Sequence, residues 1–271
     1  MKARYLLWTV LAGTALQLGS GCADGSQVSL FTSAPRVWTG VVTEDIRIDL
    51  SGLKRLDVDT YNGSLEHTCL SPGRHVAVNV AKKAGGANKA DAQAALEAIE
   101  ILVEDRGNGA KRVGWRWKCP RRHSWSAHVS FKTDAPASLA YGGETYNGDV
   151  DVTGMLKDVR VTTYNGSIRV QCAGPELSVE SYNGNVKVDL TECPTLHGEI
   201  DSYNGDIRLL VAAGFSADLA CETYNGEIKC EAPWQVRRAS RRKLVGQIGA
   251  GGREVEITTY NGDIHIESAG E

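Results

Sequence analysis

The sequence predicts a mainly β protein, a parallel β-helix-like solenoid of about six stacked turns preceded by a small α+β capping domain. Three observations support this prediction. The phrase Tyr-Asn-Gly occurs seven times, each copy following Ser or Thr and preceding a polar and then an aliphatic residue. From Tyr146 to Tyr224 the copies recur every 18 or 21 residues, which is the signature of stacked repeats. Between the copies, apolar and polar residues alternate as they do in half-buried strands.

The copies are predicted to be the corners of the solenoid, with two strands per turn. Equivalent residues of adjacent turns then lie ~4.8 Å apart, so that tyrosines stack and asparagine amides hydrogen-bond along the axis. Glycine is expected because a tight corner needs a positive φ. An Asn-Gly pair is also typical of type I′ hairpins, so an antiparallel meander is the alternative. The structural ladder comprises Tyr146, Asn147, Gly148, Tyr164, Asn165, Gly166, Tyr182, Asn183, Gly184, Tyr203, Asn204, Gly205, Tyr224, Asn225, Gly226, Tyr260, Asn261 and Gly262.

The long interval from Tyr224 to Tyr260 indicates a hidden turn, because 36 residues are two periods of 18. Residues 245–248, Val-Gly-Gln-Ile, have the glycine, polar, isoleucine order of a corner, and we predict a degenerate turn there. The strand at 263–267 would then be the last of the stack and would have a free edge. Free edges recruit other chains, so weak homo-association through this C-terminal edge is expected.

The N-terminal residues are typical of a lipoprotein signal. Lys2 and Arg4 precede an apolar run from Tyr5 to Leu18, and small residues then lead to Cys22. Such a segment is an export signal, and its apolar run is shorter than a typical membrane span. The cysteine after small residues resembles a bacterial lipobox, which implies cleavage before Cys22 and lipidation of its sulfur. We therefore expect an exported protein, lipid-anchored in the cell envelope, on the outer membrane if present and otherwise on the cell surface.

The chain is predicted to have four parts. They are the signal peptide at 1–21, a tether at 22–40, an N-terminal α+β capping domain at 41–140 and the solenoid at 141–271. The tether contains Gly25-Ser26 and Ser33-Ala34-Pro35, which are typical of linkers. The capping domain contains the one convincing helix, the Ala-rich segment 89–99, which would cover the first turn and protect its edge.

The cysteines predict disulfides. Six of them follow Cys22, an even number in a chain that is expected to be exported. Their positions within the repeat place four of them in two neighbouring pairs. The other two cysteines lie in the predicted capping domain. The possible pairs are Cys172 with Cys193, Cys221 with Cys230, and Cys69 with Cys119. A zinc site is not expected, because the chain has neither Cys-x-x-Cys nor paired histidines.

Several of these features together resemble a known family. The first Asn-Gly corner, the strand V-A-V-N-V-A-K-K at 76–83, the short Ala-rich helix and the ending GQIGAGGREVEITTYNGDI at 246–264 are similar to the bacterial putative-adhesin family with β-strand repeats. That family is a domain of unknown function, and the resemblance covers roughly residues 45–267. It implies a stacked β fold in a cell-envelope protein, with proposed stress-sensing roles among its members, and it supplies no catalytic motif.

Two groups of residues are candidates for a ligand surface. Trp115 and Trp117 share one strand face among cations, and indole rings stack on sugars; the alternative is that both fill the core. A cationic segment before the predicted degenerate corner suits lipid headgroups or anionic polymers, and a solvated insertion is its alternative. The members of this segment are Arg237, Arg238, Arg241, Arg242 and Lys243.

Composition and motifs favour a role without catalysis or cofactor. A net charge of −3 excludes a strongly basic nucleic-acid binder, so the expected partners are the membrane, through the anchor, and an anionic glycan or envelope component. We predict a structural, adhesive or envelope-stress role. A binding module for anionic cell-surface polysaccharide is the alternative, and a β-helix polysaccharide lyase or hydrolase is the remote one. The acidic residues after the corner glycines are interpreted as turn formers. Calcium binding by them is the alternative, and no metal site is predicted.

Overall fold

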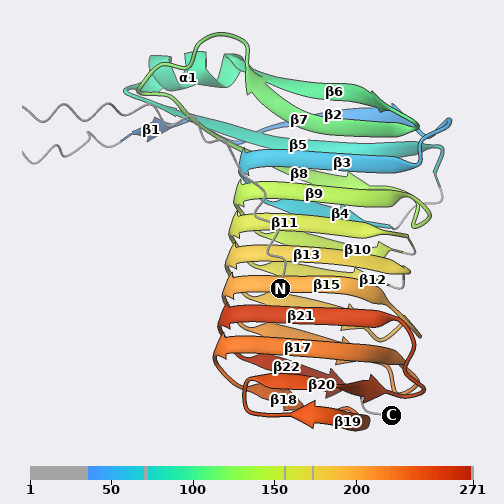
Figure 1. The fold of residues 1–271 in the computed structure, drawn as a ribbon. Coiled ribbons are helices and arrows are strands. Elements are labelled where there is room, and N and C mark those ends of the chain that lie inside the picture. The colour runs from blue at the N-terminus through green and yellow to red at the C-terminus, as the bar shows by residue number, and fades with distance from the viewer. Residues whose placement is uncertain (1–35, 70–72, 156, 173, 270–271) are drawn as a thin grey trace, which may run out of the picture. The chain divides into compact units, whose positions relative to one another are not determined.

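The computed structural model describes residues 36–69, 73–155, 157–172 and 174–269. The predicted signal peptide, the lipidation residue Cys22 and the first part of the tether lie outside these ranges. The described residues from 36 onward belong to one compact unit, which is dominated by two long sheets and carries one short helix (Figure 1).

Each turn of the solenoid adds one strand to each sheet, before and after its Tyr-Asn-Gly corner (Figure 1). The strands that run into the corners form the entry sheet, which contains, in stacking order, β3 (Arg55–Asn62), β9 (Ala140–Asn147), β11 (Val159–Asn165), β13 (Glu176–Asn183), β15 (His197–Asn204), β21 (Glu254–Asn261) and β17 (Ala217–Asn225). The strands that leave the corners form the exit sheet, which contains β4 (Leu65–Thr68), β10 (Val150–Met155), β12 (Ile168–Cys172), β14 (Val186–Leu190), β16 (Ile207–Val211), β22 (Ile264–Ser268) and β18 (Ile228–Cys230). Neighbours are parallel and the corners are in register. The predicted parallel solenoid is therefore confirmed, and these turns are not an antiparallel meander.

The alternating residues of each strand form one aliphatic core between the sheets. In β12, Ile168 and Val170 are buried whereas Arg169 is exposed. Each buried side chain of this size contributes roughly 1.5–3 kcal/mol relative to an exposed one. Because Ile168 lies opposite Val150 and Val186 on the neighbouring strands, the core continues from turn to turn.

The first Tyr-Asn-Gly copy stacks directly on the second, although 85 residues separate their tyrosines. β3 pairs with β9, and β4 pairs with β10. The solenoid therefore contains this corner as well as the six that recur in the C-terminal half. The residues between β4 and β9 leave the stack and return to it.

This insertion extends both sheets beyond the first turn. On the exit sheet, β8 (Ser126–Asp134) joins β4 to β5 (His75–Gly86), which also pairs with β1 (Val37–Trp38) and β2 (Val42–Asp49). On the entry sheet, β7 (Ala110–Trp117) joins β3 to β6 (Ile99–Gly107). Both sheets thus continue across residue 140, where we predicted the boundary between the capping domain and the solenoid.

The predicted helix is present as α1 (Lys89–Glu97) and lies at the end of the stack where the insertion lies (Figure 1). Asn88 caps it, because its side chain accepts a hydrogen bond from the backbone nitrogen of Asp91. The helix is two residues shorter than predicted, since Ile99 already begins β6.

The C-terminal turns do not stack in sequence order. β21 lies between β15 and β17, and β22 lies between β16 and β18. The degenerate corner predicted at 245–248 is wrong: those residues belong to β20 (Lys243–Ile248), which pairs antiparallel with β17 and with β19 (Trp234–Ala239). The free edge predicted at 263–267 is also wrong, because β22 has a neighbour on each side and Ile266 is fully buried.

Candidate functional site

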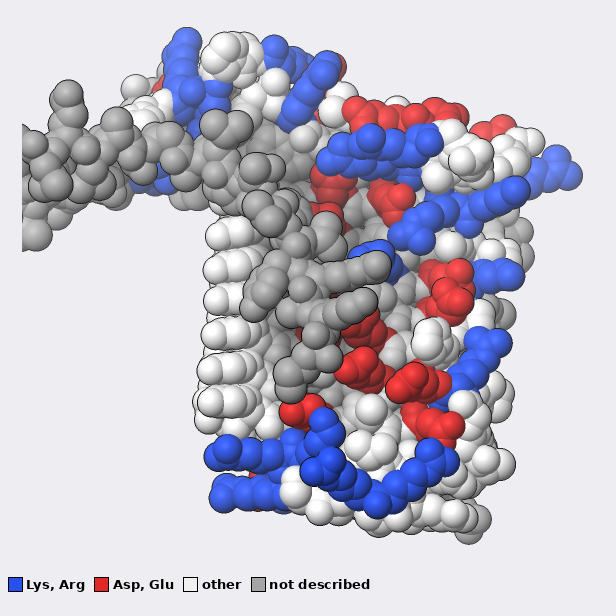
Figure 2. All heavy atoms as spheres, in the orientation of Figure 1, with Lys and Arg blue, Asp and Glu red and all other residues white. Residues whose placement is uncertain are grey.

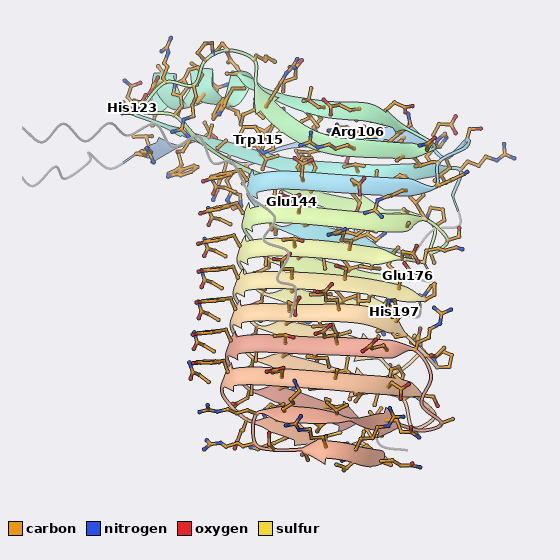
Figure 3. The ribbon with its side chains drawn as sticks, in the orientation of Figure 1. Arg106, Trp115, His123, Glu144, Glu176 and His197 are labelled. Atoms are coloured by element: carbon orange, nitrogen blue, oxygen red, sulfur yellow. The ribbon has the colours of Figure 1, made fainter. Side chains whose placement is uncertain are left out.

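Seven tyrosines form one continuous stack along the corners (Figure 3). Successive ring centroids are 4.5–4.9 Å apart, and the rings are parallel to within 6°. Within the stack both faces of a ring are covered by neighbouring rings, so edges and hydroxyl groups face the solvent. Along the five inner rings a sugar ring therefore has no aromatic face to stack on, which favours the structural interpretation. Tyr61 and Tyr224, at the ends, have one ring neighbour each. The order of the stack is Tyr61, Tyr146, Tyr164, Tyr182, Tyr203, Tyr260 and Tyr224.

Beside the tyrosines, the asparagines form a chain of hydrogen bonds. Each corner asparagine donates its side-chain amide to the Oδ1 of the asparagine before it in the stack, at 2.6–2.9 Å. The first, Asn62, donates to the carbonyl oxygen of Ala127 at 3.3 Å. All amides point the same way, so each bond polarises the next, and loss of one asparagine leaves two partners unpaired.

The hydroxyl residue of each corner points inward and forms a hydrogen bond with the adjacent turn. Thr163 Oγ1, for example, donates to the carbonyl oxygen of Gly148 at 2.9 Å. A Cβ on Gly166 would lie 2.0 Å from that same oxygen. Among the corner glycines only Gly63 has a positive φ, 152°. The predicted reason for glycine is therefore wrong: these corners need glycine because the turns approach too closely for a Cβ.

The polar residue after the glycine also links the turns. Oδ1 of Asp206 accepts the backbone N–H of Asp263 at 2.9 Å, and Oδ1 of Asp263 accepts that of Glu227 at 2.9 Å. Asp149 accepts the backbone N–H of Ser167 in the same way. These carboxylates therefore accept hydrogen bonds from the backbone of the adjacent turn. The described residues contain no group of three or more His, Cys, Asp and Glu side chains that could hold a metal ion.

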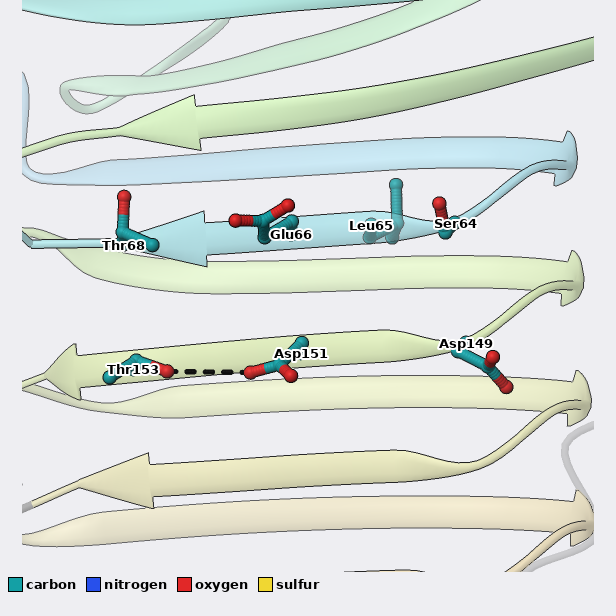
Figure 4. Close-up of a pocket in the computed structure, with 7 residues that line it drawn as sticks. All are labelled: Ser64, Leu65, Glu66, Thr68, Asp149, Asp151 and Thr153. Carbon is teal, nitrogen blue, oxygen red and sulfur yellow. Dashed lines mark hydrogen bonds between the residues drawn. The ribbon is translucent and has the colours of Figure 1, made fainter.

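A hollow of about 330 Å³ lies on the outer face of the exit sheet, between β4 and β10 (Figure 4). Its acidic side chains are Glu66, Asp149 and Asp151, and Lys132 Nζ lies 2.5 Å from Glu66 Oε1. Thr153 Oγ1 donates to Asp151 at 3.3 Å, as the dashed line shows. The lining residues are Ser64, Leu65, Glu66, Thr68, Asp149, Asp151 and Thr153. This arrangement is an open polar surface, without a convergent nucleophile or base.

The outer face of the entry sheet is acidic along its middle strands (Figure 2). Burial and then the charge of Glu199 raise the pKa of Asp201 to about 7, with smaller contributions from Glu180 and Glu256. The pKa of Glu144 on β9 is also raised, first by burial. Crowding of carboxylates on parallel, in-register strands is the physical cause, because like charges ~5 Å apart repel each other.

Trp115 and Trp117 do lie together, as predicted, but they pack against the core (Figure 3). Their rings contact edge to face with centroids 5.4 Å apart, and Trp117 also contacts Trp125. The indole N–H of Trp115 donates to Thr60 Oγ1 at 3.1 Å. The core interpretation therefore fits these two residues better than a sugar-binding platform.

The five predicted cations lie on the β19–β20 hairpin, at the end of the stack, where Lys and Arg side chains gather (Figure 2). Lys243 Nζ lies 2.6 Å from Glu222, and Arg237 Nη2 donates to Gln247 at 2.9 Å. The segment is thus not an insertion before a further corner, and sequence reasoning missed that it belongs to the end of the stack.

The loop of this hairpin takes the place of a further corner. The backbone N–H of Ile228 donates to the carbonyl oxygen of Arg241 at 3.1 Å, as Ile264 donates to Glu227 on the turn before. The backbone N–H of Thr223 donates to the carbonyl oxygen of Arg242 at 3.0 Å. The corner at the end of the stack, residues 223–228, therefore forms its outer backbone hydrogen bonds with a cationic loop.

The six cysteines in the described residues are free thiols. Cys172 and Cys193 interact electrostatically, as do Cys221 and Cys230. Burial raises the pKa of Cys172 and of Cys221 to about 12. The two pairs are thus close, and oxidation of each to a disulfide stays a prediction. The predicted pair of Cys69 with Cys119 is wrong, because Cys69 follows the end of β4 that lies away from the corner, whereas Cys119 follows the corner end of β7.

Comparison with one solved structure agrees with this architecture. A "putative cell adhesion protein" from Clostridium sporogenes has a TM-score of 0.56 and 11% identity, over 85% of this chain and 100% of that chain, which shows a shared fold. A "putative adhesin" from Bacteroides fragilis has a TM-score of 0.31 and 11% identity, over 85% of this chain and 97% of that chain. No curated protein matches the sequence.

The repeats themselves match a family model. Residues 144–267 match the family model described as Toastrack DUF4097. This range begins just before the second Tyr-Asn-Gly corner and ends in β22. The repeat region of this chain is therefore similar to the Toastrack DUF4097 family, which confirms the resemblance drawn from its motifs.

Proposed function

We propose that the protein is a non-catalytic, lipid-anchored scaffold of the cell envelope with a structural or adhesive role. The observation that carries this proposal is the continuous corner ladder. In every turn the tyrosine, asparagine and hydroxyl side chains are engaged with adjacent turns, so the most repeated residues of the chain serve the stack. The fold shared with the cell adhesion protein supports a β-solenoid of the same kind.

The proposed membrane attachment is a lipid on Cys22. Among the helices of the described residues, none is long and apolar enough to cross a membrane. Cys22→Ser in the full chain is expected to move the protein from the membrane fraction to the soluble fraction, because a single cysteine would carry the acyl chains. Cys119→Ser, at an exposed thiol, is the matched control and should stay bound. Retention of Cys22→Ser in membranes after a high-salt wash contradicts lipid anchoring.

The role itself is tested in the producing cell. Deletion of the gene is expected to reduce surface adhesion or tolerance of envelope stress, and the full chain should restore the phenotype whereas Cys22→Ser should not. Purified protein should release no products from a panel of uronic-acid glycans, with or without calcium. Turnover of any of these glycans would exclude the scaffold proposal and favour the lyase or hydrolase.

A second candidate function is binding of an anionic cell-surface polysaccharide by the cationic hairpin. The supporting observation is the exposure of Arg238 and Arg242 at the end of the stack, where neither is buried by a further turn. Full-length protein should then be retained on an anionic glycan matrix at low salt and elute as salt rises. Arg238→Ser with Arg242→Ser should elute at lower salt, while Arg169→Ser with Arg208→Ser, on the exit sheet, should not. Equal elution of the two double variants contradicts this function.

A further inference from the structure

A histidine, a cysteine and a methionine meet inside the first turn of the solenoid. His67 lies on β4, Cys69 follows that strand, and Met155 ends β10. Sγ of Cys69 lies 3.4 Å from Sδ of Met155 and 3.7 Å from Nε2 of His67. His67 and Met155 are buried, whereas Cys69 is only partly buried, so an ion would reach the cluster past its thiol.

The neighbours of His67 hold its imidazole ring in place. Nδ1 of His67 forms a hydrogen bond with Thr133 Oγ1 at 2.6 Å, and Thr133 Oγ1 lies 3.3 Å from the carbonyl oxygen of Glu66. The ring of Tyr141 stacks on the imidazole with centroids 4.1 Å apart. The tautomer that donates from Nδ1 to Thr133 leaves the lone pair on Nε2, which faces Cys69. Histidine ligands of metals are held in this manner, by a hydrogen bond on the other ring nitrogen.

We propose that His67, Cys69 and Met155 form a binding site for Cu(I). Thiolate and thioether donors select this soft ion. A metal ion bonds sulfur at ~2.3 Å and nitrogen at ~2.0 Å. Two such donor atoms that make an angle of ~95–120° at the ion therefore lie ~3.2–4.0 Å from each other. Both distances from Cys69 fall in this range.

The charges of the site favour a monovalent ion. On binding, the Cys69 thiol loses its proton to solvent and a Cu–S bond forms, so that one thiolate and one Cu(I) give a neutral complex. A neutral complex costs less to bury than a charged one. Zn²⁺ takes N, O and thiolate ligands, so the thioether of Met155 distinguishes the two metals.

The test uses the full, reduced chain, titrated with Cu(I) against a chromophoric Cu(I) chelator without oxygen. Cys69→Ser and Met155→Leu are expected to lose at least ~10-fold in affinity for one equivalent, about 1.4 kcal/mol. Leucine keeps the volume of Met155. Cys119→Ser is the matched control for a cysteine outside the cluster and should bind as the wild type does.

Selenomethionine makes the assignment specific, because the chain contains two methionines, Met1 and Met155. X-ray absorption at the selenium edge should show a Cu neighbour at bonding distance in the labelled wild type and no such neighbour in labelled Met155→Leu. The proposal is overturned when selenium has no Cu neighbour, or when Cys69→Ser and Met155→Leu bind Cu(I) as tightly as Cys119→Ser. Zn²⁺ binding of equal affinity that depends on Met155 would overturn the choice of metal.

Discussion

The side-chain amide of Asn261 donates to Oδ1 of Asn204 at 2.7 Å, although Asn225 lies between them in the sequence. Asn225 in turn donates to Asn261 at 2.8 Å. The last corner of the sequence is therefore inserted between two earlier ones. The chain runs out to the β19–β20 hairpin at the end of the stack and returns to fill the remaining turn.

The first prediction concerns this inserted turn. Ile266→Pro should lower the free energy of unfolding by at least ~3 kcal/mol, because proline removes a ladder hydrogen bond in an interior strand. Ile266 is fully buried in β22, between β16 and β18. Val41→Pro, in an exposed segment before β2, is the control. Urea denaturation measures both variants, and an Ile266→Pro protein as stable as Val41→Pro would place β22 at an edge.

The second prediction concerns the asparagine chain. Asn204→Ala should destabilise the protein by about 1–3 kcal/mol, because it leaves Asn261 without an acceptor and Asn183 without a donor. Ser178→Ala, on the outer face of β13, should change stability by less than ~0.5 kcal/mol. Thermal unfolding compares the two. Equal melting temperatures would show that the asparagine chain adds nothing to stability.

The third prediction concerns the corner glycines. Gly184→Ala should cost more than ~3 kcal/mol, because its Cβ would lie 1.9 Å from the carbonyl oxygen of Gly166 and backbone on both turns would have to move. Gly214→Ala has nothing within 4 Å of its Cβ and should be tolerated. The measurement is the urea midpoint of each variant; a tolerated Gly184→Ala would mean that adjacent turns separate easily.

The fourth prediction concerns pH. The folded pKa of Asp201 is about 7, against ~3.9 for an unfolded aspartate. Between these values the folded state binds more protons than the unfolded state, so this group makes stability fall as pH rises from ~4 to ~7. Asp201→Asn removes the effect. Its melting temperature relative to the wild type should therefore be higher at pH 8 than at pH 4.

His67 contributes a slope of the opposite sign, because burial lowers its pKa to about 4 and stability is lost as pH falls from ~6.5 toward that value. The comparison of Asp201→Asn with the wild type cancels this contribution, since both contain His67. Ser178→Ala, which removes no titratable group, is the control and should show no such pH trend. An identical Asp201→Asn difference at pH 4 and pH 8 contradicts the raised pKa.

The sequence by itself determined the parallel solenoid, its corners and the tyrosine and asparagine ladders. A repeat of about 20 residues with a strict alternation leaves few ways to bury one apolar face per strand. The position of α1 was also predictable, because capping and alanine content are local. The hydroxyl donors and the need for glycine without positive φ were not read from the sequence, since both depend on the distance between adjacent turns.

Only the tertiary structure decided which corner stacks on which. The corners are so alike that any of them can pair with any other, so local sequence does not distinguish Asn225 from Asn261 as the neighbour of Asn204. The hairpin that ends the stack makes the difference, because β20 occupies the other side of β17. The His67, Cys69 and Met155 cluster has the same origin: Cys69 and Met155 are 86 residues apart and meet because β4 pairs with β10 across the insertion. The whole stack determines which of several similar strands pair with each other. The repeat pattern in the sequence does not contain this information.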